Sequence, residues 1–159
     1  ANLLSRKGDD EQAFRWLQAS AEQGQREATY LLARAYREGT GTATNPSQAQ
    51  VYLERAANAG DVKAMLQLAS QEKGLPSSRQ WLKQAANKNA SEAQYQLGMD
   101  YLEGSSGNID LQEAYVWLSL ALVNGENRGR AKLEQLSSRL SAEELTQAQN
   151  RIHSGLNGF

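Results

Sequence analysis

The chain has 159 residues, 40% hydrophobic and 22% charged, which is enough apolar material for one ordinary domain with a modest core. Lys and Arg total 17 and Asp and Glu total 18, so the net charge of −1 offers no attraction for nucleic acid or an anionic membrane. The absence of cysteine and the single histidine exclude disulfides, thiolate nucleophiles, cysteine-ligated metals and multi-histidine sites, and no apolar run approaches the roughly 18 to 20 residues of a membrane helix.

Two kinds of segment alternate along the chain. The first joins an aromatic residue and Leu to two small or apolar residues and a Gly-like break, at residues 16–24, 52–60, 81–89 and 117–125. The second places Ala, Leu and Tyr one helical turn apart, at residues 28–39 and 93–104 and more weakly at 64–74. These spacings predict helices over residues 11–23, 27–38, 47–59, 62–73, 77–88, 91–103, 110–124, 128–139 and 142–154.

Residues typical of helix ends stand at the predicted boundaries. Asn45 before Pro46 is an N-cap with proline at the first helical position, and Asp61 is placed to cap the next helix. The segment Ser141-Ala142-Glu143-Glu144 reads as a capping box. The acidic run Asp9-Asp10-Glu11 is interpreted as the start of a helix, where carboxylates favour the positive end of the dipole, rather than as a cation site.

Helix pairs of this kind cannot bury their apolar faces alone, so they must stack on one another. The sequence therefore predicts an all-α fold, a right-handed α-solenoid superhelix of antiparallel helix pairs. Within a single repeat domain of residues 1–159 we expect a partial first repeat (1–27), a repeat (28–63), a shortened repeat (64–92), a further repeat (93–130) and C-terminal capping helices (131–159). Residues 2–8 resemble the tail of an earlier helix, so we expect the C-terminal part of a longer repeat protein; the alternative is a natural half-repeat at a mature N-terminus.

The pattern resembles the Sel1-like repeat, a relative of the tetratricopeptide repeat, over about residues 8–130. The best stretch has the family's residues at Ala28, Leu32-Ala33, Tyr36, Gly39, Gly41, Gln48-Ala49, Tyr52, Ala56-Ala57 and Gly60. In the family, Gly39-Thr40-Gly41 belongs to the inter-helix loop rather than to a phosphate loop. The resemblance implies a non-catalytic adaptor that holds a protein or peptide partner in a bacterial assembly, secretion or signalling system of the cell envelope, without a cofactor. It weakly favours the bacterial periplasm over the cytoplasm.

In related solenoids the first helix of each pair lines a concave groove. If that carries over, the partner-binding residues are Tyr30, Arg34, Arg37, Leu66, Ser70, Lys73, Tyr95, Met99 and Leu102. Tyr, Arg and Met are typical of protein-binding hot spots. The alternatives are that Tyr30, Leu66 and Tyr95 pack between helix pairs and that the two arginines form a solvated face.

Other readings of the residues are weaker. Trp16, Trp81 and Trp117 share one repeat position, which indicates core residues rather than a sugar-stacking platform. His153, near the end of the last helix, is expected at the surface, because no Ser or Asp stands at a catalytic spacing from it. No catalytic or metal-binding residues are predicted. Two alternative functions remain: a structural cap of a longer solenoid, and binding or hydrolysis of cell-wall fragments or β-lactams.

Overall fold

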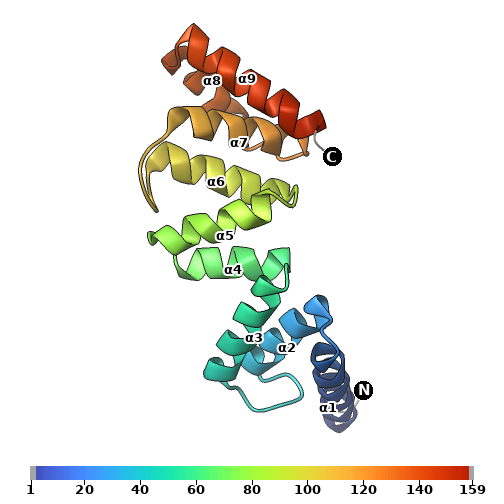
Figure 1. Ribbon diagram of the computed structural model, residues 1–159. Coiled ribbons are helices and arrows are strands. Elements are labelled where there is room, and N and C mark those ends of the chain that lie inside the picture. Colours follow the sequence, from blue (N-terminus) through green and yellow to red (C-terminus); the bar gives the residue numbers. More distant parts are fainter. Residues whose placement is uncertain (1–2, 158–159) are drawn as a thin grey trace. The chain divides into compact units, whose positions relative to one another are not determined.

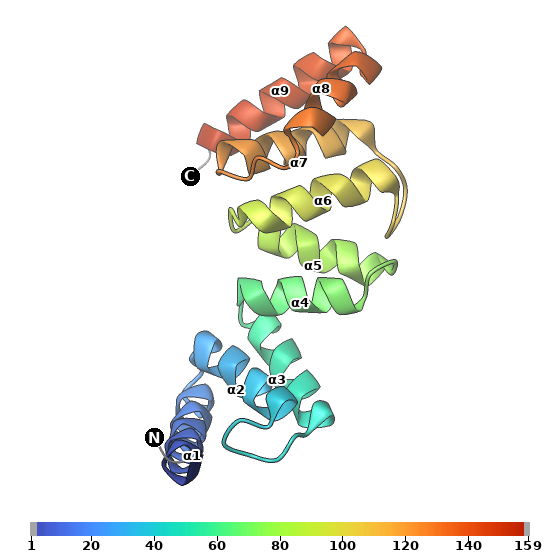
Figure 2. The ribbon, with the colours of Figure 1, turned by 180° about the vertical axis from the view of Figure 1, so that it is seen from behind.

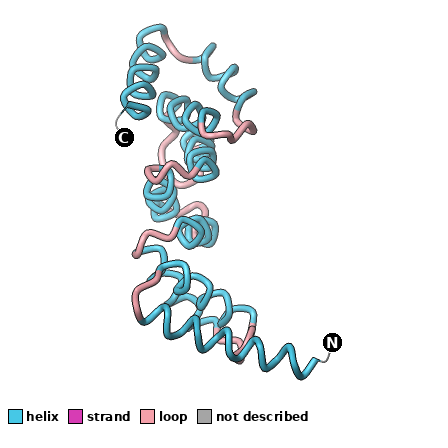
Figure 3. The backbone as a smooth tube through the Cα atoms, turned by 90° about the vertical axis from the view of Figure 1, so that its right-hand side faces the viewer, coloured by secondary structure: helices cyan, strands magenta, loops and turns pink. Residues whose placement is uncertain are grey.

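The computed structural model describes residues 3–157, and all regular structure within them is helical (Figures 1 and 3). This confirms the predicted fold class, an all-α solenoid of antiparallel helix pairs. Helices α2 to α9 begin and end within a turn of the predicted boundaries. The helices are α1 (Leu3–Glu22), α2 (Arg26–Glu38), α3 (Pro46–Asn58), α4 (Val62–Gln71), α5 (Pro76–Ala86), α6 (Ser91–Glu103), α7 (Leu111–Val123), α8 (Arg130–Arg139) and α9 (Ala142–Asn157).

The first helix differs from its prediction. It runs unbroken from Leu3 to Glu22, so Asp9-Asp10-Glu11 lies inside α1 and the interpretation of this run as a helix start is wrong. Residues 3–8 likewise belong to α1 and not to an earlier helix, while Asn2 lies outside the described residues. The physical reason is that neither proline nor a capping hydrogen bond interrupts residues 3–10, so the helix continues through Gly8.

The predicted caps are confirmed. The side chain of Asn45 accepts a hydrogen bond from the backbone N–H of Gln48 at 3.1 Å, and Asp61 accepts one from Ala64 at 2.9 Å. At the start of α9, the Glu144 N–H donates to the Ser141 hydroxyl while the Ser141 N–H donates to the Glu144 carboxylate, which completes the capping box. Most Gly-like breaks have positive φ, including Asn89, a non-glycine at 60°.

The chain forms two compact units, residues 1–68 and 69–159. In the first unit α2 packs against α1 on one side and α3 on the other, around buried Leu32, Ala33 and Leu53. An edge-to-face contact between Phe14 and Tyr36, with ring centroids 5.2 Å apart, joins α1 to α2. The turn from α2 to α3 lies directly on α1, since a Cβ added at Gly41 would stand 2.1 Å from the Asp10 carbonyl oxygen.

In the second unit α5, α6 and α7 follow one another in sequence and in space, and α8 and α9 cover α7 (Figures 1 and 2). Helices α6 and α7 approach each other closely, since a Cβ added at Gly98 would lie 2.7 Å from Leu118 Cγ. Val116 of α7 forms a small core with Ala148 and Ile152 of α9. Most other side chains of α8 and of the described part of α9 are polar and exposed.

Candidate functional site

A cavity of about 330 Å³ lies in the second unit, between the end of α4, the start of α5, and α6 with its following turn. Four of the predicted partner-binding residues line it together: Ser70, Lys73, Tyr95 and Met99. This volume is near the lower end of the roughly 300–1,000 Å³ of small-molecule sites. The cavity therefore has room for a short piece of an extended chain.

The helical period of α6 orients the lining side chains. Tyr95, Met99 and Glu103 are each one turn apart, so they share a face of α6. Buried Leu82 of α5 also lines the cavity and adds apolar surface to it. Exposed Lys73, in the turn after α4, and exposed Glu103 both line the cavity, so its rim has one residue of each charge.

Tyr95 is fixed by a neighbouring arginine. The guanidinium carbon of Arg128 lies 4.3 Å from the centre of the Tyr95 ring, in a cation–π contact. Arg128 also forms ion pairs with Glu92 of α6 and with Glu126 in its own loop. Hydrogen bonds from Arg128 lower the pKa of Glu126 to about 2, and the carboxylate in turn raises the pKa of Arg128. These contacts tie the α7–α8 loop to α6 and hold the Tyr95 ring in place.

The inner wall of the cavity is polar, which sequence reasoning missed. Asp100 lines the cavity and is 6% exposed, and its carboxylate accepts a hydrogen bond from Arg79 Nε at 2.5 Å. The Arg79 guanidinium also lies over the Tyr101 ring, 4.3 Å from its centre. Ser106, a residue 5% exposed in the turn after α6, lines the cavity too. None of these residues belongs to a motif, because they meet only when α5 packs on α6.

The remaining predicted residues lie outside this cavity. Arg34 and Arg37 are exposed on α2 and pair with Glu38, and the hydrogen bond from Arg37 lowers the pKa of that carboxyl group. This arrangement agrees with the alternative of a solvated face. Half-buried Tyr30 and Leu66 belong to the first unit, and half-buried Leu102 of α6 does not line the cavity.

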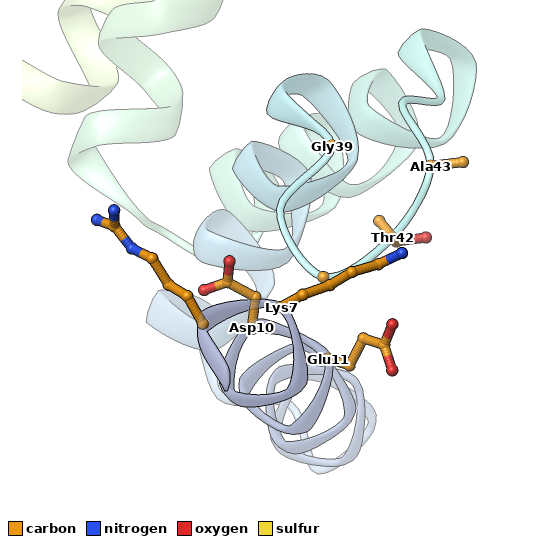
Figure 4. Close-up of a pocket in the computed structure, with 8 residues that line it drawn as sticks. Lys7, Asp10, Glu11, Gly39, Thr42 and Ala43 are labelled. Atoms are coloured by element: carbon orange, nitrogen blue, oxygen red, sulfur yellow. The ribbon is translucent and has the colours of Figure 1, made fainter. Parts of the chain in front are cut away.

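The first unit has a larger cavity of its own, about 610 Å³, between α1 and residues 39–43 (Figure 4). Its charged lining residues, Arg6, Lys7, Asp10 and Glu11, balance one another. Figure 4 shows Lys7 extending along the loop towards Thr42. Sequence reasoning assigned this loop only to the connection between helices, because its packing on α1 has no local signal.

The prediction that the three tryptophans are core residues is wrong for Trp16, which is 63% exposed. Trp81 and Trp117 are half-buried, and the Trp117 indole donates to Glu113 at 3.1 Å. The leucine that follows the aromatic residue in each repeat is also more exposed in α1. Leu17 is half-buried, whereas Leu53, Leu82 and Leu118 are at most 5% exposed. The reason is that the described residues place no helix against this face of α1.

His153 is exposed on α9. Within the described part of the chain, no three His, Asp or Glu side chains lie close enough together to hold a metal ion. None of the helices in residues 3–157 is both long and apolar enough to cross a membrane.

Comparison with known proteins gives consistent matches. The sequence model of the Sel1 repeat matches residues 4–25, 26–61, 62–89 and 91–122. An exopolysaccharide production negative regulator from Rhizobium meliloti (strain 1021) is 31% identical over 141 residues, covering 76% of this chain and 52% of the regulator. The chain thus spans about half the length of this curated relative.

Two solved structures are also similar. The crystal structure of a Sel1 repeat protein from Oxalobacter formigenes has a TM-score of 0.74 and 29% identity, over 80% of this chain and 39% of that one. A protective antigen of uropathogenic Escherichia coli strains, which displays an SLR fold, has a TM-score of 0.48 and 24% identity, over 91% of this chain and 40% of that one.

Proposed function

Because the chain belongs to the Sel1 repeat family, we propose that it is an adaptor that binds an extended segment of a partner protein in the cavity of its second unit. Sel1 repeat proteins generally mediate protein–protein interactions and are typically non-catalytic scaffolds. The observation that carries the proposal is the meeting of Ser70, Lys73, Tyr95 and Met99 in one cavity. The other predicted residues, Tyr30, Arg34, Arg37, Leu66 and Leu102, are proposed as a secondary part of the partner-binding surface.

The chemistry of the cavity suits a peptide. Tyr95 and Met99 offer an aromatic and a polarisable apolar surface, which are enriched where proteins bind one another. The hydroxyl groups and charged side chains around them supply donors and acceptors for a main chain. Because Arg128 holds Tyr95 in place, less side-chain entropy is lost on binding.

We place the partner in a bacterial envelope system concerned with assembly, secretion or signalling. This part of the proposal is supported by the Rhizobium relative, a negative regulator of exopolysaccharide production. Regulation by an adaptor requires a partner of its own, and the cavity is the best-equipped site for it within the described residues.

One observation favours a second candidate function, a structural stretch within a larger stack of repeats. Trp16 is 63% exposed, and Leu17 is less buried than its counterparts in the other repeats. In this role the exposed face of α1 packs on a further helix. We expect the chain to self-associate as its concentration rises, and Trp16→Lys to abolish this association. A chain that stays monomeric in sedimentation contradicts this second function.

The cavity proposal is tested by substituting Met99, which lies in the middle of its α6 face. Met99→Lys places a flexible cation among the apolar contacts and is expected to remove partners that the wild-type chain captures from a bacterial lysate. Val123→Lys is the matched control, since Val123 is 58% exposed near the end of α7 and lines none of the described cavities. Capture is compared by quantitative mass spectrometry, with circular dichroism to confirm folding.

Arg34→Glu is measured alongside and reports whether the first unit contributes to binding. Partners lost with Met99→Lys and kept with Val123→Lys support the cavity. Equal capture by the wild type and Met99→Lys refutes it.

A further inference from the structure

The second unit carries a buried ion pair where the first unit is apolar. The repeat pattern that aligns Tyr36 with Tyr101 also aligns Phe14 with Arg79. In the first unit the Phe14 ring packs edge-to-face on Tyr36, whereas in the second the Arg79 guanidinium lies over Tyr101. The same alignment places Asp100 where the first unit has Ala35, which is 6% exposed.

Packing alone does not require this ion pair. The Arg79 and Asp100 side chains are 13% and 6% exposed, so both groups have lost most of their water. Replacing a buried ion pair by well-packed apolar residues is often neutral or stabilising. The chain itself contains the apolar solution at the equivalent positions of its first unit. Asp100 therefore has a role other than packing, and its position in the cavity wall indicates that this role is in binding.

The polar groups of the cavity define what it accepts. Arg79 balances the charge of Asp100, and exposed Lys73 and Glu103 balance each other, so the site favours neither a cation nor an anion. The Asp100 carboxylate is a hydrogen-bond acceptor, and the hydroxyl of Ser106, a residue 5% exposed, is able to donate or accept. Ser78, by contrast, already donates to the Ala69 carbonyl oxygen at 2.8 Å.

We propose that the cavity selects a carboxamide, the side chain of an Asn or Gln residue in the bound segment; this inference rests on the proposed function. A carboxamide is neutral, donates through its NH₂ group to Asp100 and accepts through its oxygen from Ser106. Its methylene groups pack on Tyr95 and Met99. A carboxylate of the same shape has no proton to donate to Asp100, and an aliphatic side chain offers no hydrogen bond to either Asp100 or Ser106.

The experiment selects peptides from a phage-displayed random library on the wild-type chain and measures the affinity of the enriched peptides. We expect Asn or Gln at one position of the enriched motif. Changing it to Asp or Glu, or to Leu, is expected to weaken binding by about tenfold or more, because buried hydrogen-bonding groups then lose their partners. The inference is overturned if the peptides whose binding is lost with Met99→Lys have only basic, acidic or aliphatic residues, and no Asn or Gln, at their enriched positions.

The protein is changed in parallel to copy its own first unit, with the double variant R79F/D100A. This variant is expected to fold with an unchanged or higher melting temperature and to bind the selected peptides about tenfold or more weakly. If the double variant does not fold, Ser106→Ala makes the same test with the ion pair intact, and Ser138→Ala on exposed α8 is its control.

The outcomes separate the two proposals. If no peptide is enriched, or if enriched peptides bind Met99→Lys as well as the wild type, the proposed function fails. If binding depends on Met99 but is unaffected by R79F/D100A, or by Ser106→Ala when the double variant does not fold, the proposed function stands and carboxamide selection is refuted.

Discussion

At the scale of single residues, the distance between helices is set by very small side chains. Gly98 of α6 lies against Leu118 of α7, and an added Cβ would stand 2.7 Å from Leu118 Cγ and 3.1 Å from its backbone nitrogen. The equivalent positions in the other first helices are Ala33 and Ala69, both buried. At the observed spacing of α6 and α7, adding one methyl group at this position would turn a close contact into a steric clash.

We predict that Gly98→Ala destabilises the chain. Alanine favours a helix interior over glycine by about 1 kcal/mol, but overpacking against Leu118 costs about 1–3 kcal/mol, so a net loss of about 1 kcal/mol is expected. The measurement is the midpoint of urea unfolding at constant slope.

Gly8→Ala is the matched control, because Gly8 also lies inside a helix but an added Cβ meets nothing within 4 Å. It is expected to raise the midpoint. A Gly98→Ala midpoint equal to or above that of the wild type contradicts the close approach.

At the scale of the elements, loops are joined to helices through polar side chains. Gln94 is 1% exposed; it donates to the Ala86 carbonyl oxygen at 3.2 Å and accepts from the Asn124 amide at 2.8 Å, which links the ends of α5 and α7. Arg128 ties the α7–α8 loop to α6 through Glu92 and Tyr95. Both links depend on hydrogen-bonding geometry, and the second also depends on ionisation.

We predict that the contribution of Arg128 to stability depends on pH. The native pKa of Glu126 is lowered from 4.5 to about 2, so this pair stabilises the fold fully above pH 4.5 and loses that effect as the pH falls towards 2. Arg128→Gln should therefore lower the unfolding midpoint at pH 6, and its difference from the wild type should shrink between pH 4.5 and 2.

Arg139→Gln on α8 is the control, since Arg139 is exposed and forms no ion pair within residues 3–157. It should show no such pH-dependent difference. An Arg128→Gln effect of constant size down to pH 2 would show that packing on Tyr95, and not the carboxylate, accounts for the stabilisation.

At the scale of the whole molecule, each unit has its own core. Leu32 and Leu53 are buried in the first unit, and Leu82, Leu97 and Leu118 in the second. In repeat proteins, stability is approximately a sum of local contributions and nearest-neighbour interfaces. A change near the C-terminus should therefore have its main effect nearby.

Ile152→Ala is expected to loosen the second unit selectively. Ile152 is 9% exposed and packs with Val116 and Ala148, so its truncation should cost about 2 kcal/mol, at the lower end for a buried isoleucine. Amide hydrogen exchange should accelerate in α7 and α9 and stay unchanged in α2 and α3. Ile109→Ala, at a position 61% exposed, is the control with no expected effect. Equal acceleration in both units would mean that the chain unfolds as one cooperative block.

The sequence by itself determined the helices, their caps and the repeat pattern. Asn45, Asp61 and the Ser141–Glu144 box act on backbone groups three residues away, so their effect is local. The apolar period also placed Tyr95 and Met99 on one face of α6. Two of the four predicted residues that line the cavity lie side by side for this reason.

Only the tertiary structure decided which of these residues meet, and what lies between them. The pairing of Arg79 with Asp100 arises when α5 packs on α6, and no local spacing signals this pairing or the burial of Ser106. The exposure of Trp16 has the same origin. Its repeat position predicts burial, but burial requires a neighbouring helix, and the described residues bring none to that face of α1. Helix formation follows from neighbours along the chain, whereas burial and pairing follow from neighbours in space.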